Sequence, residues 1–162
     1  MVMRPALVLI LILTGCLAPS LTGQAARAAE TVSSAVVFMY HRFGEPEFPS
    51  TNVRLEQFAA HLAEIAAGGY DVKPLPEIVA AFRRQETLPD RTIALTIDDA
   101  FLSVHDRAWP MLAKAGLPFT LFVATDAIDA KRPGHMSWAQ LRALTASGVT
   151  IGNHTGSHAH LP

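Results

Sequence analysis

Hydrophobic residues along the chain form two alternating kinds of pattern. Continuous apolar runs, which are typical of buried parallel strands, cover residues 33–40, 92–97, 118–124 and 149–151. Between and after these runs, hydrophobic residues recur three or four positions apart, which predicts helices that begin near Leu55, Pro76, Ser103 and Ser137. Strands that alternate with helices predict an α/β fold in which parallel strands are covered by helices.

Glycines and capping residues mark the ends of these helices. Gly68, Gly116 and Gly148 each follow a helical segment, where a residue without a side chain commonly ends a helix. Ser137 and Gln140 have the spacing of a capping box, in which each side chain bonds the other's backbone N–H. These residues therefore predict where the helices begin and end more closely than the hydrophobic pattern alone does.

Polar residues follow each of the four predicted strands. They are His41, Asp98-Asp99, Thr125-Asp126 and His154. In parallel α/β folds the carboxyl ends of the strands meet at one edge and carry the chemistry. We therefore expect these side chains to form one site.

The first 29 residues have the pattern of an export signal. Arg4 precedes an apolar run over residues 6–13, which is too short to span a bilayer. Residues 26–28 (Ala-Arg-Ala) fit an ordinary signal peptidase site, whereas residues 13–16 (Leu-Thr-Gly-Cys) resemble a bacterial lipobox with Cys16 as the lipidated residue. Both alternatives predict an exported protein, periplasmic or extracellular, and the second predicts a lipid anchor at the membrane.

Composition and charge argue against some classes of binding partner and some kinds of metal site. The 13 basic and 14 acidic residues give a net charge of −1 without a basic run, which argues against a nucleic acid partner. A single cysteine excludes an intrachain disulfide and a cysteine-based zinc site. Histidine is more informative, because three of the seven histidines lie between His154 and His160.

Histidine and aspartate pairs are the candidate metal-binding groups. On a helical turn, the spacing of His154 and His158 would put both imidazoles on one face, where they could bind one metal ion. Two histidines and one carboxylate hold many hydrolytic zinc ions. The second carboxylate of the Asp98-Asp99 pair could then take a proton from water. Taken singly, the histidines also fit a solvated turn and the aspartates a helix cap.

Two motifs in this order resemble the polysaccharide deacetylase family (carbohydrate esterase family 4, the NodB homology domain). Residues 96–100 (Thr-Ile-Asp-Asp-Ala) are similar to the family's T-F-D-D-G motif, and residues 154–158 match its H-[ST]-x-x-H motif. Residues 39–42 and 136–152 also resemble segments of the family. The similarity extends over about residues 36–161, so we expect residues 33–162 to be part of a polysaccharide deacetylase catalytic domain.

The resemblance implies a metal-dependent amidase that removes acetyl groups from N-acetylglucosamine-containing polysaccharide. It assigns Asp98 as the general base and Asp99, His154 and His158 as ligands of zinc or a similar divalent ion. His41, which ends the first strand, is a candidate lining residue of the same site. The expected products are acetate and a free amine on the sugar.

Two departures from the family qualify these expectations. Ala100 stands where the motif has glycine, so Asp99 would be displaced if that position has a positive φ. The family's later motifs, which supply an arginine and a Leu-x-His histidine, are absent from the 162 residues, and a distorted (β/α) barrel truncated after its fourth strand is expected. The alternatives are a non-catalytic relative that binds glycan or metal and an inactive truncated remnant.

Overall fold

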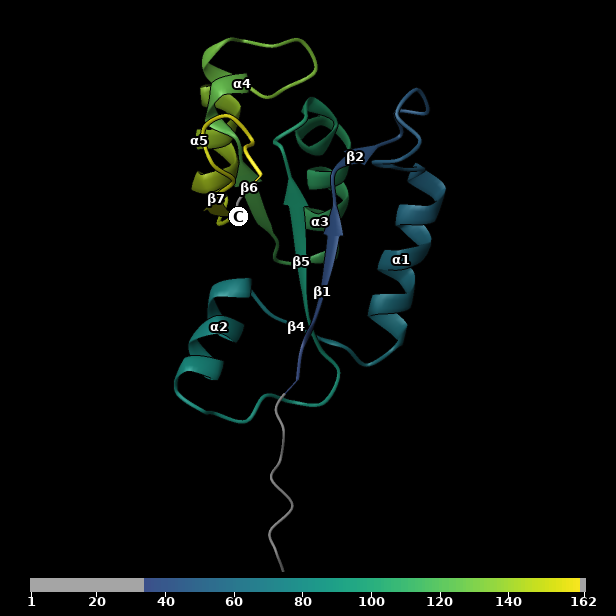
Figure 1. Cartoon of the computed structure of the whole chain (residues 1–162). Coiled ribbons are helices and arrows are strands. Elements are labelled where there is room, and N and C mark those ends of the chain that lie inside the picture. Colours follow the sequence, from purple (N-terminus) through teal and green to yellow (C-terminus); the bar gives the residue numbers. More distant parts are fainter. Residues whose placement is uncertain (1–33, 161–162) are drawn as a thin grey trace, which may run out of the picture. The chain divides into compact units, whose positions relative to one another are not determined.

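A parallel sheet forms the centre of residues 34–160, the part of the chain that the computed structural model describes (Figure 1). Its strands are β1 (Val36–Tyr40), β4 (Asp71–Val72), β5 (Thr92–Asp98), β6 (Thr120–Val123) and β7 (Thr150–Asn153). The strand order is β1-β5-β6-β7, and β4 also pairs with the start of β5. Every pairing is parallel, so the predicted α/β class is confirmed. The predicted leader over residues 1–29, including Cys16, lies outside the described residues.

The register brings the carboxyl ends of the strands to one edge of the sheet. Tyr40 at the end of β1 pairs with Ile97, next to the last residue of β5. Asp98 pairs with Phe122 on β6, and Val123 pairs with Asn153 on β7. The residues that follow these strands therefore share the upper edge in Figure 1.

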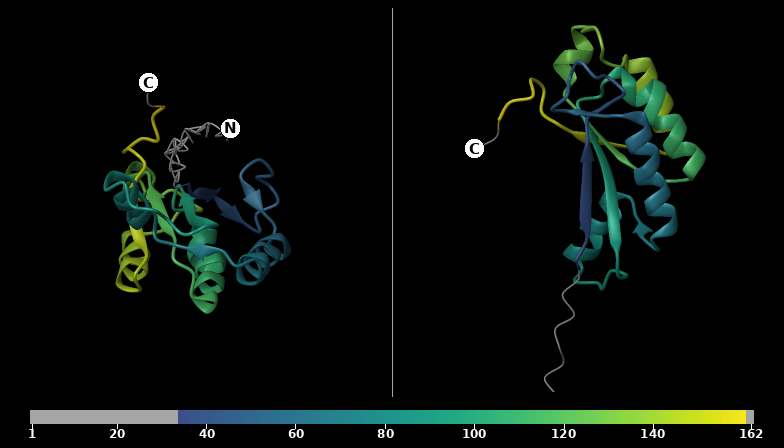
Figure 2. Two further views of the ribbon diagram at one scale, coloured as in Figure 1. Left: turned by 90° about the horizontal axis from the view of Figure 1, so that it is seen from below. Right: turned by 90° about the vertical axis from the view of Figure 1, so that its right-hand side faces the viewer.

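Helices cover mainly one face of this sheet. They are α1 (Leu55–Ala67), α2 (Leu75–Arg83), the π-helix η1 (Val104–Ala108), α3 (Trp109–Ala115), α4 (Thr125–Asp129) and α5 (Trp138–Ala146). Helices α1, α3 and α5 lie side by side on one face, as both views in Figure 2 show. No helix among residues 34–160 has the length and apolar character needed to cross a bilayer.

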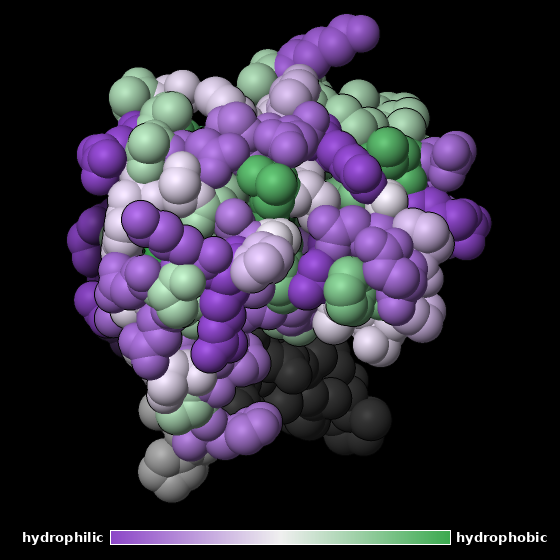
Figure 3. Space-filling view, turned by 90° about the horizontal axis from the view of Figure 1, so that it is seen from above, coloured by the Kyte–Doolittle hydropathy of each residue, from purple (hydrophilic) through white to green (hydrophobic). Residues whose placement is uncertain are grey.

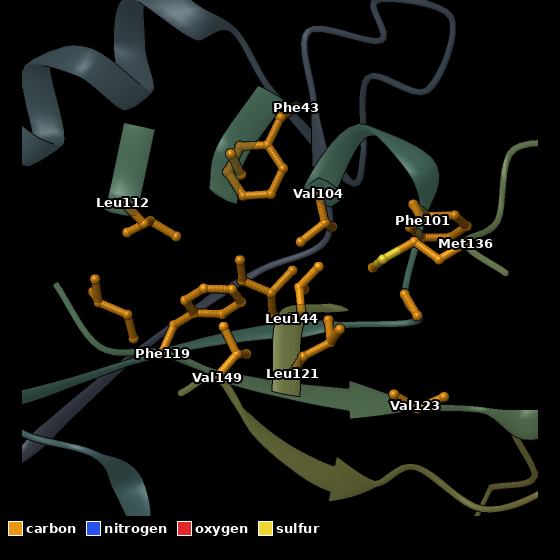
Figure 4. Close-up of a cluster of buried hydrophobic side chains, with 14 of the residues drawn as sticks. Phe43, Phe101, Val104, Leu112, Phe119, Leu121, Val123, Met136, Leu144 and Val149 are labelled. Carbon is orange, nitrogen blue, oxygen red and sulfur yellow. The ribbon is translucent and has the colours of Figure 1, made fainter. Parts of the chain in front are cut away.

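Alternate residues of β5 point to opposite faces of the sheet. Ile93, Leu95 and Ile97 belong to the main hydrophobic core under the helices, part of which Figure 4 shows. Ala94 belongs instead to a second, smaller core with residues of α2. Because side chains alternate along a strand, Asp98 lies on the same face as Ala94, away from the main core.

Strand β1 is far more exposed than its apolar sequence predicts. Val36 is 55% exposed and Met39 62%, whereas the pattern predicted a buried strand. The reason is position: within the described residues β1 pairs only with β5, so it lies at the edge of the sheet. A continuous apolar run has the same appearance in an edge strand and in a central strand.

Several short elements have no counterpart in the sequence prediction. They are β4, α4 and the two-stranded sheet of β2 (Arg42–Phe43) and β3 (Asn52–Val53). Elements this short contain too few residues to show a hydrophobic period. The helix predicted from Ser103 contains a π-helical turn, in which Trp109 N–H bonds Val104 O, five residues earlier.

Two of the predicted helix boundaries are reproduced in detail. Gly116 ends α3 with a left-handed φ of 64°. Ser137 and Gln140 form the expected capping box at the start of α5. The short strand β7, which leads to the second motif, begins directly after this capped helix.

Candidate functional site

Adjacent aspartates end β5 with very different surroundings. Asp98 is the last residue of the strand and is 8% exposed. Asp99 starts the following turn with a φ of 70°, and Ala100 continues it with a φ of 54°. This turn directs the Asp99 carboxylate to the upper edge of the sheet, toward the loop that follows β7.

That loop brings both motif histidines to Asp99. The Nε2 atoms of His154 and His158 lie 3.6 Å and 3.3 Å from Asp99 Oδ1. One ligand atom from each residue lies within 4.8 Å of the other two. Ligands arranged tetrahedrally around zinc at about 2.1 Å lie about 3.4 Å from one another. Two imidazoles and a carboxylate with these separations fit a zinc ion without a large rearrangement.

The two histidines lie on a bent loop and not on the helical turn that their spacing suggested. Thr155 and His158 have φ values of 66° and 59°. Asn153 Oδ1 accepts a hydrogen bond from Thr155 N, and Thr155 Oγ1 accepts one from Ala159 N. The imidazole centroids are 4.6 Å apart. Local side-chain bonds to the backbone, and not helical hydrogen bonds, therefore hold the motif in shape.

Neighbouring strands attach this loop to the sheet. His154 N–H bonds Val123 O at the end of β6, and Asp126 N–H at the start of α4 bonds Gly156 O. A Cβ at Gly156 would lie 3.1 Å from Asp126 Oδ1, so glycine allows this close approach. The loop is therefore anchored on both sides of its central residues.

His41 and Asp98 form the second part of the candidate site. His41 Nε2 lies 3.8 Å from Asp98 Oδ2. Burial raises the pKa of Asp98 above its ordinary value, and the nearby Asp99 carboxylate acts in the same direction. His154 and His41 oppose this shift when they carry positive charge. The candidate lining residue His41 thus lies beside the candidate base.

Ala100 does not displace Asp99. The φ of Ala100 is positive, which is the condition under which the alanine was expected to displace Asp99. Nevertheless Asp99 Oδ1 is within 3.6 Å of both histidine nitrogens, so the expected displacement is wrong. A strain of about 1–2 kcal/mol at one residue is small enough for the packing of a fully buried side chain to offset.

The side chains that surround a cleft next to Asp99 and His158 were not identified as a group from the sequence. The cleft has a volume of about 340 Å³, and Asp126, Arg132 and His135 line it. The sequence predicts Asp126 at the strand edge and places His135 in a loop, where it fits a structural or a substrate-facing role. The sequence does not predict the position of Arg132, because the hydrophobic pattern does not determine where a loop residue lies relative to the end of a distant strand.

Comparisons with known proteins agree with the two motifs. Residues 85–162 match the family model described as polysaccharide deacetylase. The protein YxkH of Bacillus subtilis (strain 168), which is named for the same family, is 25% identical over 125 residues, which make up 77% of this chain and 43% of that protein.

Solved structures of deacetylases share the fold. IcaB from Ammonifex degensii superposes with a TM-score of 0.67 and 30% identity, over 76% of this chain and 54% of that one. A de-N-acetylase from Aggregatibacter actinomycetemcomitans superposes with a TM-score of 0.70 and 21% identity, over 78% of this chain and 56% of that one. The chain thus spans about half the length of these relatives. In sequence pattern and fold it resembles the polysaccharide deacetylases, as its two motifs predicted.

Proposed function

We propose that this chain contributes the metal-binding part of a deacetylase that hydrolyses N-acetyl groups of N-acetylglucosamine-containing polysaccharide. The observation that carries the proposal is the convergence of Asp99, His154 and His158, whose ligand atoms lie within 4.8 Å of one another. A buried carboxylate, Asp98, precedes the aspartate of this group and has the chemistry of a general base.

Asp99, His154 and His158 would hold the metal ion, for which we propose zinc. Imidazole and carboxylate ligands suit this ion, and three protein ligands leave a coordination position open, as in hydrolytic zinc enzymes. When bound, zinc supplies Lewis-acid polarisation of a carbonyl and lowers the pKa of water to about 7.

Asp98 would take the proton from the attacking water. In the hydrolysis, the water oxygen bonds the acetyl carbon, the C–N bond breaks, and acetate and a sugar amine form. Burial raises the pKa of Asp98, which makes its carboxylate a stronger proton acceptor than an exposed aspartate. His41 Nε2 lies 3.8 Å from the Asp98 carboxylate, close enough to interact with its charge.

Acetate release from chitin oligomers in the presence of zinc tests this proposal. The Asp98→Asn variant should release acetate about 10²- to 10⁴-fold more slowly, the usual contribution of a general base. Its zinc content should remain about one ion per chain, because Asp98 is not among the three ligands. Oligomer binding without metal-dependent acetate release would instead support the alternative of a non-catalytic glycan-binding relative.

We further propose that the protein is exported from a bacterial cell, since its polymeric substrate would lie outside the cytoplasm. Mass spectrometry of the mature N-terminus distinguishes the two processing routes. A lipidated Cys16 would indicate membrane attachment, whereas an N-terminus after Ala28 would indicate an unanchored periplasmic or extracellular protein. An intact leader on the protein recovered from cells would contradict export.

A further inference from the structure

The cleft beside the candidate metal ligands is lined by two of them but not by the candidate base. Its lining includes Asp99 and His158, together with Asp126, Arg132, His135 and Ser157. Neither Asp98 nor His41 is among the lining residues. Its volume of about 340 Å³ is within the usual range of small-molecule sites. Most of the surface at this end of the molecule is hydrophilic (Figure 3).

Two charged side chains in this cleft have no bonding partner. Within residues 34–160, neither the Arg132 guanidinium nor the Asp126 carboxylate makes a hydrogen bond or an ion pair, and both residues are exposed. Arginine offers five N–H donors and the carboxylate offers acceptors only. Together they match a ligand with many hydroxyl groups, which both donate and accept. Their opposite charges do not favour an anionic ligand over a neutral one.

The wall that carries His135 is fixed to the turn after β5. Leu102 N–H bonds Gly134 O at 2.7 Å, and Met136 N–H bonds Ala100 O at 2.9 Å. These two backbone bonds hold the loop of His135 against the residues that directly follow Asp99. Backbone hydrogen bonds therefore join the wall of His135 to the turn that carries the candidate metal ligand.

Stacked side chains support the same wall from behind. The His135 ring lies 4.8 Å from the Phe101 ring, centroid to centroid. The Arg42 guanidinium covers Phe101 at 3.4 Å and also lies 3.8 Å from the Phe48 ring. His135 is the partly exposed end of this stack, so its ring is a wall of the cleft already in place before a ligand binds.

Resting on the function proposed above, we propose that Asp126, Arg132 and His135 bind a neutral hexosamine unit next to the unit that is deacetylated. Arg132 and Asp126 would bond its hydroxyl groups, and the His135 ring would lie against the sugar. The site would then prefer oligomers over N-acetylglucosamine itself, because only an oligomer reaches both the metal ligands and this cleft.

Calorimetric titration of the zinc-loaded chain with chitotetraose tests the assignment. Arg132→Ala and Asp126→Ala should each weaken tetramer binding about 10-fold, the loss expected for a hydrogen bond to a charged group. Arg132→Lys should give an intermediate affinity, because lysine keeps the charge but not the planar set of donors. Arg142→Ala removes an exposed arginine of α5 that does not line the cleft, and should bind as the unaltered chain does.

The outcomes separate this inference from the proposed function. Tetramer binding that is absent, or unaffected in Arg132→Ala and Asp126→Ala, overturns the assignment even if acetate is released. Tighter binding of a glucuronate-containing tetramer than of chitotetraose also overturns it. Arginine-dependent tetramer binding without acetate release by any form of the chain supports the assignment and rejects the deacetylase proposal. Thermal unfolding of each variant, compared with the unaltered chain, distinguishes a loss of affinity from a loss of folding.

Discussion

The Nε2 atom of His158 lies 3.3 Å from Oδ1 of Asp99, although the two residues follow different strands, β7 and β5. This separation is short enough for one ion to be bound by both. It depends on the parallel register, which ends both strands at the same edge of the sheet. Metal binding should therefore be coupled to the folding of the whole described sheet.

Zinc should stabilise the folded chain, and His158→Ala should abolish most of this effect. An ion that binds only the folded state at 100 times its Kd adds about 2.7 kcal/mol to the free energy of unfolding. The measurement is thermal unfolding with and without zinc, together with the zinc content per chain. His160→Ala is the matched control, since that exposed histidine is not in the ligand group. Equal zinc content in both variants would reject the ligand assignment.

Gly152→Ala should weaken zinc binding although residue 152 is not a ligand. A Cβ at this position would lie 2.5 Å from two atoms of the Phe122 ring on β6, so the strand or the ring must move. His154 follows two residues later and would move with β7. We expect about a tenfold loss of zinc affinity in calorimetric titration.

A double variant tests whether the loss comes from this contact. Phe122→Leu removes the ring, so combining it with Gly152→Ala should restore part of the affinity and give a non-additive pair. Strictly additive effects of the two substitutions would show that the glycine acts in another way.

Asp98→Asn should stabilise the metal-free chain at neutral pH. Because burial raises the pKa of Asp98, the folded state keeps this proton to a higher pH than the unfolded chain does. Stability therefore falls as pH rises from the unfolded pKa, about 3.9, through the folded pKa, and stays lower above it. Asparagine removes this loss, so the variant should have the higher free energy of unfolding at pH 7.

Urea unfolding in the presence of a chelator, at pH 7 and at pH 4, measures this difference. The advantage of Asp98→Asn should shrink at pH 4, because the raised pKa lets the folded state hold the Asp98 proton more firmly than the unfolded chain does as the pH falls. Asp90→Asn, at an exposed position, is the matched control for the loss of one carboxylate. An Asp98→Asn variant that is less stable than the unaltered chain at pH 7 would contradict the role of burial.

Ala100→Gly should change stability by less than about 1 kcal/mol. Glycine would relieve about 1–2 kcal/mol of left-handed strain at a φ of 54°. It would lose about 0.8 kcal/mol from the buried methyl group and about 0.5–1 kcal/mol from backbone entropy. By contrast, Gly116→Ala adds strain at a φ of 64° with no atom within 4 Å of the new Cβ, and should destabilise by about 1 kcal/mol.

Chemical denaturation of the two single variants checks this comparison. A large stabilisation by Ala100→Gly would mean that the methyl group packs poorly, despite its complete burial.

The features that sequence predicted well are those with local physical causes. The continuous run of β5 and the capping box of Ser137 and Gln140 depend on neighbouring residues, and both appear as expected. The exposure of β1 depends on how many strands pair with it, which its own residues do not encode. Likewise, the bent loop of His158 results from local hydrogen bonds that the four-residue spacing does not specify.

The candidate site shows the same division. Asp98, Asp99, His41 and His154 each end a recognisable strand or directly follow one, so their convergence follows from parallel topology. Arg132 comes from a loop without a period. Its position in the cleft depends on the neighbouring backbone bonds to the turn after β5, which only the folded chain reveals.

The alternation along β5 separates two kinds of mutational effect within a single strand. Ile93, Leu95 and Ile97 face the main core, whereas Asp98 lies on the other face with Ala94. Substitutions at Asp98 should therefore change or remove the proton transfer proposed for it while the core stays packed. A slip of one residue would instead bury Asp98 in the core and expose its neighbours, losing stability and chemistry together. The register of β5 therefore determines both the packing of the main core and the position of Asp98.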